Sequence, residues 1–328
     1  MILPLHPQPQ HDELLSSWMV RLAFANGFFL HTFYNKVLNY KGPIWTRDID
    51  RFCPNNLLDL IASNTGQNIE SLKNLTFYEY IGTIVDKITI NGNSRWIMPQ
   101  GKYHRLHKRA SVQICPLCLK EKSYFKKQWR LSLFAICEKH QCLLYERCPK
   151  CNSYISYHRL GINNKPILLP DENIARCYFC GLEFQKLLPE RLDNVYVGNY
   201  AQLLTNLIKN NDYGYYQYSD SSVEFYNGVR FLISAIIGRR GEKLRNRLYL
   251  KTNIELSEIS SKKIIGFEYL SVKERFNIMI VIAWLLNNWP NNFISIFKVL
   301  KYTKSNFTDY KKIIPIWLLR ILSYTSDY

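Results

Sequence analysis

Acidic side chains are scarce in this sequence of 328 residues, which has 26 Asp and Glu against 43 Lys and Arg and a formal net charge of +17. The shortage argues against a metal-dependent nuclease or transposase, because such enzymes hold their ions with clustered carboxylates. A Gly-rich phosphate loop, a nucleophile-elbow serine and an HExxH motif are also missing. The sequence therefore predicts a binding protein and not an enzyme.

Long apolar runs are missing as well. The most apolar run, Ile278 to Leu286, covers nine residues, whereas a helix that spans a membrane needs about twenty. Met1 is followed by a proline-rich stretch and not by the basic and apolar regions of a signal peptide. We therefore expect a cytoplasmic protein without a membrane partner. The positive charge predicts a polyanionic partner, with nucleic acid as the first choice.

Cysteine is abundant by contrast, and its spacing is regular. Eight potential metal ligands fall into four pairs with two residues between the members of each pair. The pairs are Cys115 and Cys118, Cys137 and His140, Cys148 and Cys151, and Cys177 and Cys180. This spacing lets both side chains of a tight turn reach one tetrahedral ion, and Zn²⁺ prefers sulfur and nitrogen ligands. The gaps between the pairs are typical of ribbon-type zinc sites.

Pairing in chain order predicts one Cys₃His site and one Cys₄ site, each with a Zn²⁺ ion. Four protein ligands leave no open position on the metal, so both ions are predicted to be structural. A cross-braced arrangement, in which the first and third pairs share an ion, stays open. Disulfides or buried apolar cysteines are the simpler alternative, but nothing here indicates secretion. Cys53 and Cys142 are left over and are interpreted as buried thiols.

Short amphipathic helices are predicted near the amino terminus. Apolar spacing indicates one helix from about Leu14 to Gly27, capped by Asp12, and one from about Leu30 to Leu38. Two more, starting at Pro54 and Asn68, are separated by a glycine-bearing turn, as in a helix-turn-helix motif. Any two short packed helices give a similar sequence pattern. DNA contact by the second helix is therefore one interpretation, and plain packing or protein contact is the alternative.

Positive charge is concentrated in and before the cysteine region. Residues 95–159 hold fourteen Lys or Arg against three Asp or Glu, and residues 238–251 form a second basic patch. Basic residues that meet phosphates release counterions, so both patches predict nucleic-acid contact, with a solvated face as the alternative. The candidate residues are Lys102, Arg105, Lys108, Arg109, Lys126, Lys127, Arg130, Arg239, Arg240, Lys243, Arg245 and Arg247.

Aromatic and basic residues alternate from Tyr124 to Arg130. Such a stretch is able to stack on or clamp a nucleic acid. It is equally able to form the small core beside a zinc ribbon, and we favour the core for Trp129.

Helices are predicted again after Cys180, over about 223–237, 271–287 and 313–322. The fold class is therefore mainly α. We expect an N-terminal helix-turn-helix-like domain (1–94), a central tandem zinc-ribbon module (95–188) and a C-terminal helical domain (189–328).

Several of these motifs together resemble the TniQ/TnsD family of transposon target-selection proteins. The cysteine region is the most specific part, and the amino-terminal and carboxy-terminal ends are also similar. The segments that carry the resemblance are Leu3-Pro4, Glu13 to Trp18, Arg21 to Ala23, Asn26-Gly27, Trp96 to Pro99, Ile114 to Leu119, Trp129 to Leu131, Cys137, His140, Leu144, Cys148 to Cys151, Arg275, Trp284 to Leu286 and Trp289 to Phe293.

The resemblance implies a non-catalytic adaptor of the bacterial cytoplasm. Such a protein marks an insertion site by binding DNA or an RNA-guided CRISPR effector complex. It then recruits an AAA+ ATPase, and through it the transposase. A homodimer is left open. The sequence ends at Tyr328, before the further DNA-reading sequence of long TnsD-type members, so autonomous recognition of one site is not expected.

Two rivals remain beside this reading. A stand-alone, sequence-specific regulator would bind one short DNA site without any ATPase. A zinc-dependent nuclease would need an open metal position, which the complete ligand sets disfavour.

Overall fold

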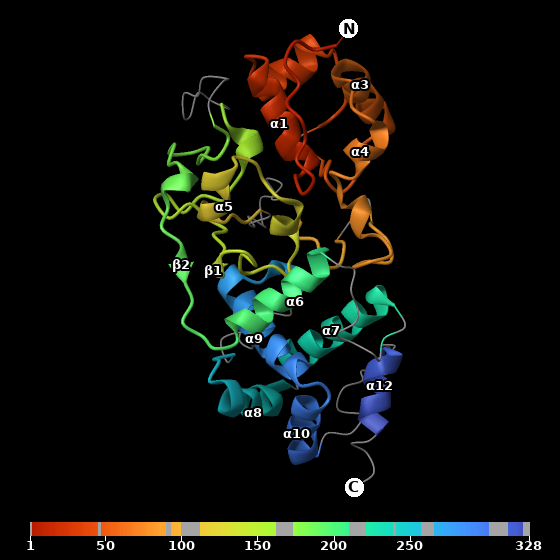
Figure 1. Ribbon diagram of the computed structural model, residues 1–328, viewed down its shortest axis with the longest axis vertical. Helices are drawn as coiled ribbons and strands as arrows, with labels where there is room; N and C mark the ends of the chain where they lie inside the picture. Colours follow the sequence, from red (N-terminus) through yellow and green to blue (C-terminus); the bar gives the residue numbers. More distant parts are fainter. Residues whose placement is uncertain are drawn as a thin grey trace. The chain divides into compact units, whose positions relative to one another are not determined.

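The protein is described by a computed structural model over residues 2–44, 47–89, 93–99, 112–161, 173–209, 219, 221–238, 241–256, 266–301 and 314–323. These residues are mainly helical, as the sequence predicts (Figure 1). Within them the two strands β1 (Cys142–Leu143) and β2 (Glu190–Arg191) pair in a small sheet. None of the helices in these ranges is long and apolar enough to cross a membrane.

The chain forms two compact units. The first consists of residues 1–81, 87–132 and 144–190, and the second of residues 82–86, 133–143 and 191–328. The three predicted domains, with boundaries after residues 94 and 188, stay a prediction.

Short helices and tight turns make up the first unit. Its α-helices are α1 (Leu15–Ala25), α2 (Leu30–Thr32), α3 (Asn55–Thr65), α4 (Ile69–Lys73) and α5 (Pro116–Glu121). The unit also contains a π-helical turn, η1 (Phe33–Val37), and the 3-10 turns η2 (Phe77–Tyr80), η3 (Lys127–Arg130), η4 (Tyr157–Arg159) and η6 (Phe184–Lys186). The core of the unit includes Trp18, Trp96 and Trp129, each almost fully buried.

Helix ends in this unit follow local sequence signals. Helix α3 starts after Pro54 and ends at Gly66, whose φ of 68° is accessible to glycine at no steric cost. Asn68 caps α4 by accepting a hydrogen bond from the amide of Glu70. Asp12 does not cap α1, and that prediction is wrong: its carboxylate accepts from the Tyr124 hydroxyl at 2.6 Å instead.

The predicted helix-turn-helix is not confirmed. Helices α3 and α4 pack together, but α4 has only five residues. On its outer face Lys73 forms an ion pair with Glu70, with Nζ and Oε1 2.7 Å apart. This pairing leaves little net positive charge to attract a phosphate backbone.

The second unit is a helical cluster around α9 (Val272–Asn287). Helices α6 (Val197–Lys209), α7 (Ser222–Ile237), α8 (Glu242–Thr252) and α10 (Asn291–Leu300) all contact α9, and Figure 1 shows α6 and α7 beside it. The turn η10 (Phe267–Tyr269) precedes α9, and α12 (Ile316–Ser323) packs on α7. Ser271 and Glu274 form a capping box at the start of α9.

One segment of the cysteine region is anchored within this second unit. The Tyr200 hydroxyl of α6 donates to the carbonyl of Leu133 and accepts from the amide of Ala135 at 3.0 Å. The buried Arg275 of α9 donates from Nη1 to the carbonyl of Phe134 at 3.2 Å. These contacts fix the backbone directly before Cys137, the first ligand of the second pair.

Candidate metal sites

Three of the four ligand pairs lie on separate turns that have the same backbone hydrogen bonds. In each turn the carbonyl of the first ligand accepts from the amide four residues later, at 2.8, 2.8 and 3.0 Å for Cys137, Cys148 and Cys177. The amide of the same cysteine donates to the carbonyl five residues later, at 2.9 Å in all three turns. The sequence predicted the tight turns from the two-residue spacing, and the repeated hydrogen bonds are their structural basis.

A left-handed residue follows the second ligand in each of these turns. Gln141, Asn152 and Gly181 have φ values of 48°, 58° and 74°. This conformation is uncommon for residues other than glycine, asparagine and aspartate. The backbone there reverses sharply, so the two ligands of each pair point to the same side.

The remaining pair lies at the start of helix α5. Cys115 immediately precedes the helix, Pro116 is its first residue, and Cys118 lies in its first turn. Proline is favoured at this position because its fixed φ suits a helix and its missing N–H has no partner there. Cys115 and Cys118 are therefore presented by a helix end and not by the turn of the other three pairs.

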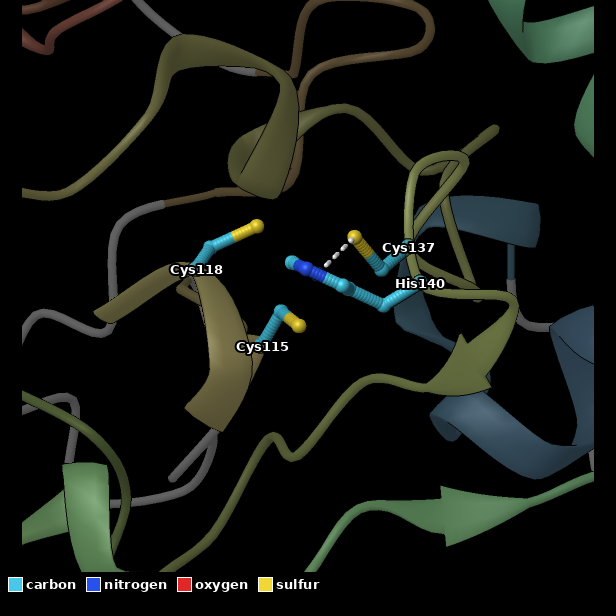
Figure 2. Close-up of side chains that lie close together, drawn as sticks. All are labelled: Cys115, Cys118, Cys137 and His140. Carbon is cyan, nitrogen blue, oxygen red and sulfur yellow. Dashed lines mark hydrogen bonds between the residues drawn. The ribbon is translucent and has the colours of Figure 1, made fainter. Parts of the chain in front are cut away.

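The first ligand group is Cys115, Cys118, Cys137 and His140, whose ligand atoms all lie within 4.8 Å of one another. Figure 2 shows the four side chains directed toward a common centre. The Sγ atom of Cys137 is 3.5 Å from Nδ1 of His140. Ordinary Zn–S and Zn–N bond lengths place two such ligands of a tetrahedral ion about 3.6 Å apart. The donor set and its spacing fit a zinc ion.

The second ligand group is Cys148, Cys151, Cys177 and Cys180, again within 4.8 Å of one another. The Sγ atoms of Cys148 and Cys180 are 3.6 Å apart, as are those of Cys151 and Cys177. Two thiolates on a tetrahedral zinc ion lie about 3.8 Å apart. The Ser153 hydroxyl lies 3.1 Å from Sγ of Cys151 and 3.2 Å from Sγ of Cys177, where it is able to donate to a thiolate.

The pairs combine in chain order, so the cross-braced alternative is not what the structure contains. All nine cysteines lie in the described part of the chain, and none of them forms a disulfide. Cys53 and Cys142 are buried outside both groups. Burial, with a smaller effect of Asp50, raises the pKa of the Cys53 thiol to about 12, as expected for an inert thiol.

The predicted nucleic-acid residues between the first two pairs differ in exposure, and burial argues against direct nucleic-acid contact by Lys127 and Arg130. Their side chains are 2% and 1% exposed. Lys127 is paired with Glu79, and Lys126 is paired with Asp12 at 3.0 Å. Trp129 is 1% exposed, so its assignment to the core is confirmed.

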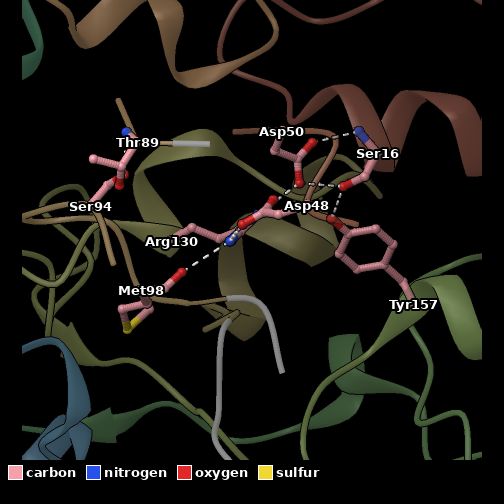
Figure 3. A network of polar contacts seen from close by, with 8 residues as sticks. All are labelled: Ser16, Asp48, Asp50, Thr89, Ser94, Met98, Arg130 and Tyr157. Atoms are coloured by element: carbon pink, nitrogen blue, oxygen red, sulfur yellow. Dashed lines mark hydrogen bonds and ion pairs between the residues drawn. The ribbon is translucent and has the colours of Figure 1, made fainter. Parts of the chain in front are cut away.

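Arg130 is the centre of a buried polar network in the first unit (Figure 3). Its guanidinium donates to both carboxylate oxygens of Asp48, to Asp50 at 3.0 Å and to the carbonyl of Met98 at 3.0 Å. Asp50 in turn accepts from the amide and the hydroxyl of Ser16, both at 2.7 Å. The Ser16 hydroxyl also contacts the hydroxyl of Tyr157.

The pKa values of the two carboxyl groups in this network are shifted in opposite directions. Burial opposes the ionisation of Asp48, but the Arg130 guanidinium outweighs it and lowers the pKa of Asp48. Burial raises the pKa of Asp50, and the nearby charge of Asp48 adds to the effect. Burial of either aspartate would be costly without Arg130 and the other donors of the network, because an unpaired buried charge is strongly unfavourable.

The second basic patch is only partly exposed. Arg245 is 5% exposed and donates to the carbonyls of Ile236 at 2.7 Å and Gly238 at 3.1 Å, which argues against its predicted nucleic-acid contact. Lys243 is exposed and Arg247 is half-buried on α8. Lys102, Arg105, Lys108, Arg109, Arg239 and Arg240 lie outside the described residues.

These observations define a class: a mainly helical protein with two groups of four cysteine or histidine ligands able to bind metal ions. Residues 4–144 match the family model described as TniQ. The chain is therefore similar to the TniQ family over this segment, which is 141 of its 328 residues. The match includes the first ligand group and Arg130 but ends before the second group. No curated protein matches the chain.

Proposed function

We propose that this protein is a non-catalytic adaptor that selects target sites for DNA transposition. The observation that carries the proposal is the match of residues 4–144 to the TniQ family. As an adaptor it binds DNA or an RNA-guided effector complex and recruits an AAA+ ATPase, through which it acts on a transposase. Its described basic candidates for contact with nucleic acid are Lys126, Lys243 and Arg247, which are at least partly exposed.

Both ligand groups are proposed to hold structural Zn²⁺. The all-sulfur group and the Cys₃His group consist of the soft ligands that this ion prefers, at separations that suit tetrahedral coordination. Four protein ligands leave no position for water or substrate, so zinc supplies folding free energy and no chemistry. The purified protein should therefore contain two zinc ions per chain by elemental analysis.

The experiment that tests the adaptor function is affinity purification of the full chain from its own cells, with and without nuclease. An AAA+ ATPase is expected in both samples, and RNA-guided subunits beside it would show how targets are chosen. Recovery of DNA-dependent proteins alone, all lost after nuclease, would overturn the proposal in favour of a stand-alone regulator.

A reconstituted transposition assay provides an independent test. Insertions with the transposase and ATPase alone should scatter along a target plasmid, and addition of this protein should concentrate them. An insertion profile that does not change on its addition would contradict target selection.

A further inference from the structure

Phe179 is an exposed aromatic residue on the second ligand group. It is the third residue of the turn Cys177–Cys180, and 56% of its surface is accessible. The side chain does not belong to the core of the unit, although Phe125 and Trp129 of the same unit are buried. A single exposed apolar residue needs no explanation by itself, so its neighbours decide what it means.

Planar cations accompany the aromatic residues of this ligand group. The Arg159 guanidinium lies 5.0 Å from the ring centroid of Tyr178, which precedes Phe179 and is oriented edge-on to it. Beside the turn Cys148–Cys151 the Arg147 guanidinium lies 3.9 Å from the ring centroid of Tyr154 and donates to the Tyr154 hydroxyl at 2.7 Å. Stacking on an aromatic face fixes the plane of a guanidinium group.

Lys150 occupies the third position of the turn Cys148–Cys151, as Phe179 does in its own turn. Lys150 is exposed. Because sulfur atoms of both turns lie within 4.8 Å of one another, the two turns place a cation and an aromatic ring on the same small structure. The acidic Glu183 is already paired with Arg176 and Lys186, at 3.7 and 3.1 Å.

We propose that the turns Cys148–Cys151 and Cys177–Cys180 bind unpaired nucleotides of a single-stranded nucleic acid. Phe179 stacks on a base, while Lys150 and the arginines contact phosphates. Aromatic side chains interleaved with Lys and Arg are the features by which proteins hold single strands, because every base has a flat face on which a ring can stack. Paired bases in a duplex do not offer that face, so duplex is disfavoured.

This inference deepens the proposed function, because it assigns the second ligand group to nucleic acid within a targeting complex. The adaptor function and the single-strand binding are tested by different results. Loss of the ATPase from the purification would overturn the adaptor function alone. Strand binding that does not depend on Phe179 would overturn only this inference.

The test uses the full, zinc-loaded chain and fluorescent 12-nucleotide strands of one mixed sequence, as RNA, as DNA and as a DNA duplex. Phe179→Ala should weaken single-strand binding by about five-fold or more and leave the zinc content unchanged. Phe179→Tyr should bind like the original protein, because it keeps the ring. Leu188→Ala is the matched control, since Leu188 is an exposed apolar residue of the same unit, at 82%. Comparison of RNA with DNA identifies the preferred strand.

Salt dependence separates stacking from charge. Lys150→Ala should reduce the slope of log affinity against log salt by about 0.7, and Phe179→Ala should leave that slope unchanged. With the original protein, a strand that carries 2-aminopurine should change its fluorescence on binding, which reports stacking even if a variant fails to fold. An unchanged affinity of Phe179→Ala, an equal loss for duplex and single strand, or no 2-aminopurine response would overturn the proposal. Loss of a protein partner alone in Phe179→Ala would overturn it in favour of a protein-docking surface.

Discussion

Arg130 and Asp48 form a two-pronged ion pair inside the first unit, with Nη1 2.7 Å from Oδ1 and Nη2 2.6 Å from Oδ2. The arginine is 82 residues from its partner in the sequence. Both side chains are buried. The pair therefore joins two distant segments of the chain through charges that water does not screen.

Replacement of Arg130 should destabilise the protein strongly. Arg130→Met leaves Asp48 buried without its cation, and removal of one partner of a buried pair costs about 3–5 kcal/mol. Chemical unfolding followed by circular dichroism measures the change. Lys120→Met, on an exposed lysine of the same unit, should shift the free energy of unfolding by no more than about 0.5 kcal/mol. Equal effects of the two variants would show that the pair is not structural.

Substitution of one cysteine should remove one metal ion. Cys148→Ser is expected to lower the zinc content from two ions per chain to one and to destabilise the first unit, because metal binding and folding are coupled. Cys142→Ser is the matched control, since Cys142 is equally buried at 1% but belongs to neither ligand group. It should retain both ions by elemental analysis. Two ions in Cys148→Ser would refute the second site.

The same substitution should have opposite effects at two helical glycines of the second unit. A Cβ atom at Gly228 in α7 would lie 2.1 Å from the Trp317 ring, so Gly228→Ala should destabilise by about 1–3 kcal/mol through overpacking. A Cβ atom at Gly198 in α6 meets nothing within 4 Å, so Gly198→Ala should stabilise by up to about 0.5–1 kcal/mol. Thermal unfolding of both variants measures the difference. Destabilisation by Gly198→Ala would contradict the packing around α6.

Glu13 should make stability depend on pH. Burial raises the pKa of its carboxyl to about 7, although Arg21 lies 2.5 Å away and acts in the opposite direction. The native state then binds more protons than the unfolded state between the usual Glu pKa and about 7, so stability should fall as the pH rises through that range.

Unfolding of the protein and of Glu13→Gln between pH 5.5 and 7 tests this expectation. The original protein should lose stability relative to the variant as the pH rises, by no more than about 2 kcal/mol over this range. This comparison cancels any effect of zinc loss that both proteins share. Parallel curves would mean that the pair with Arg21 keeps Glu13 ionised throughout.

The sequence predicted features that depend on neighbouring residues. Pro54, Gly66 and Asn68 mark helix ends through their own local preferences. The structure places α3 between Pro54 and Gly66 and begins α4 directly after Asn68. The cysteine pairs were equally readable, because two-residue spacing determines whether both side chains reach one ion.

Features that depend on distant partners were not predictable. Nothing beside Arg130 in the chain shows that Asp48 and Asp50 enclose its charge, so the residue counted as a surface cation. Lys127 and Arg245 were also counted as surface cations, since composition records a charge but not its burial. Ser153 was missed as a neighbour of Cys151 and Cys177, and only its position two residues after a ligand could have signalled it.

The shared turn at Cys137, Cys148 and Cys177 makes the ligand in its fourth position interchangeable. That position is His140 in one turn and a cysteine in the other two, while the hydrogen bonds of the turn stay the same. With zinc bound, three thiolates and a neutral imidazole give a local charge of about −1, whereas four thiolates give about −2. The residue at position 140 thus makes the charges of the two occupied sites differ, although His140 is presented by the same turn as Cys151 and Cys180.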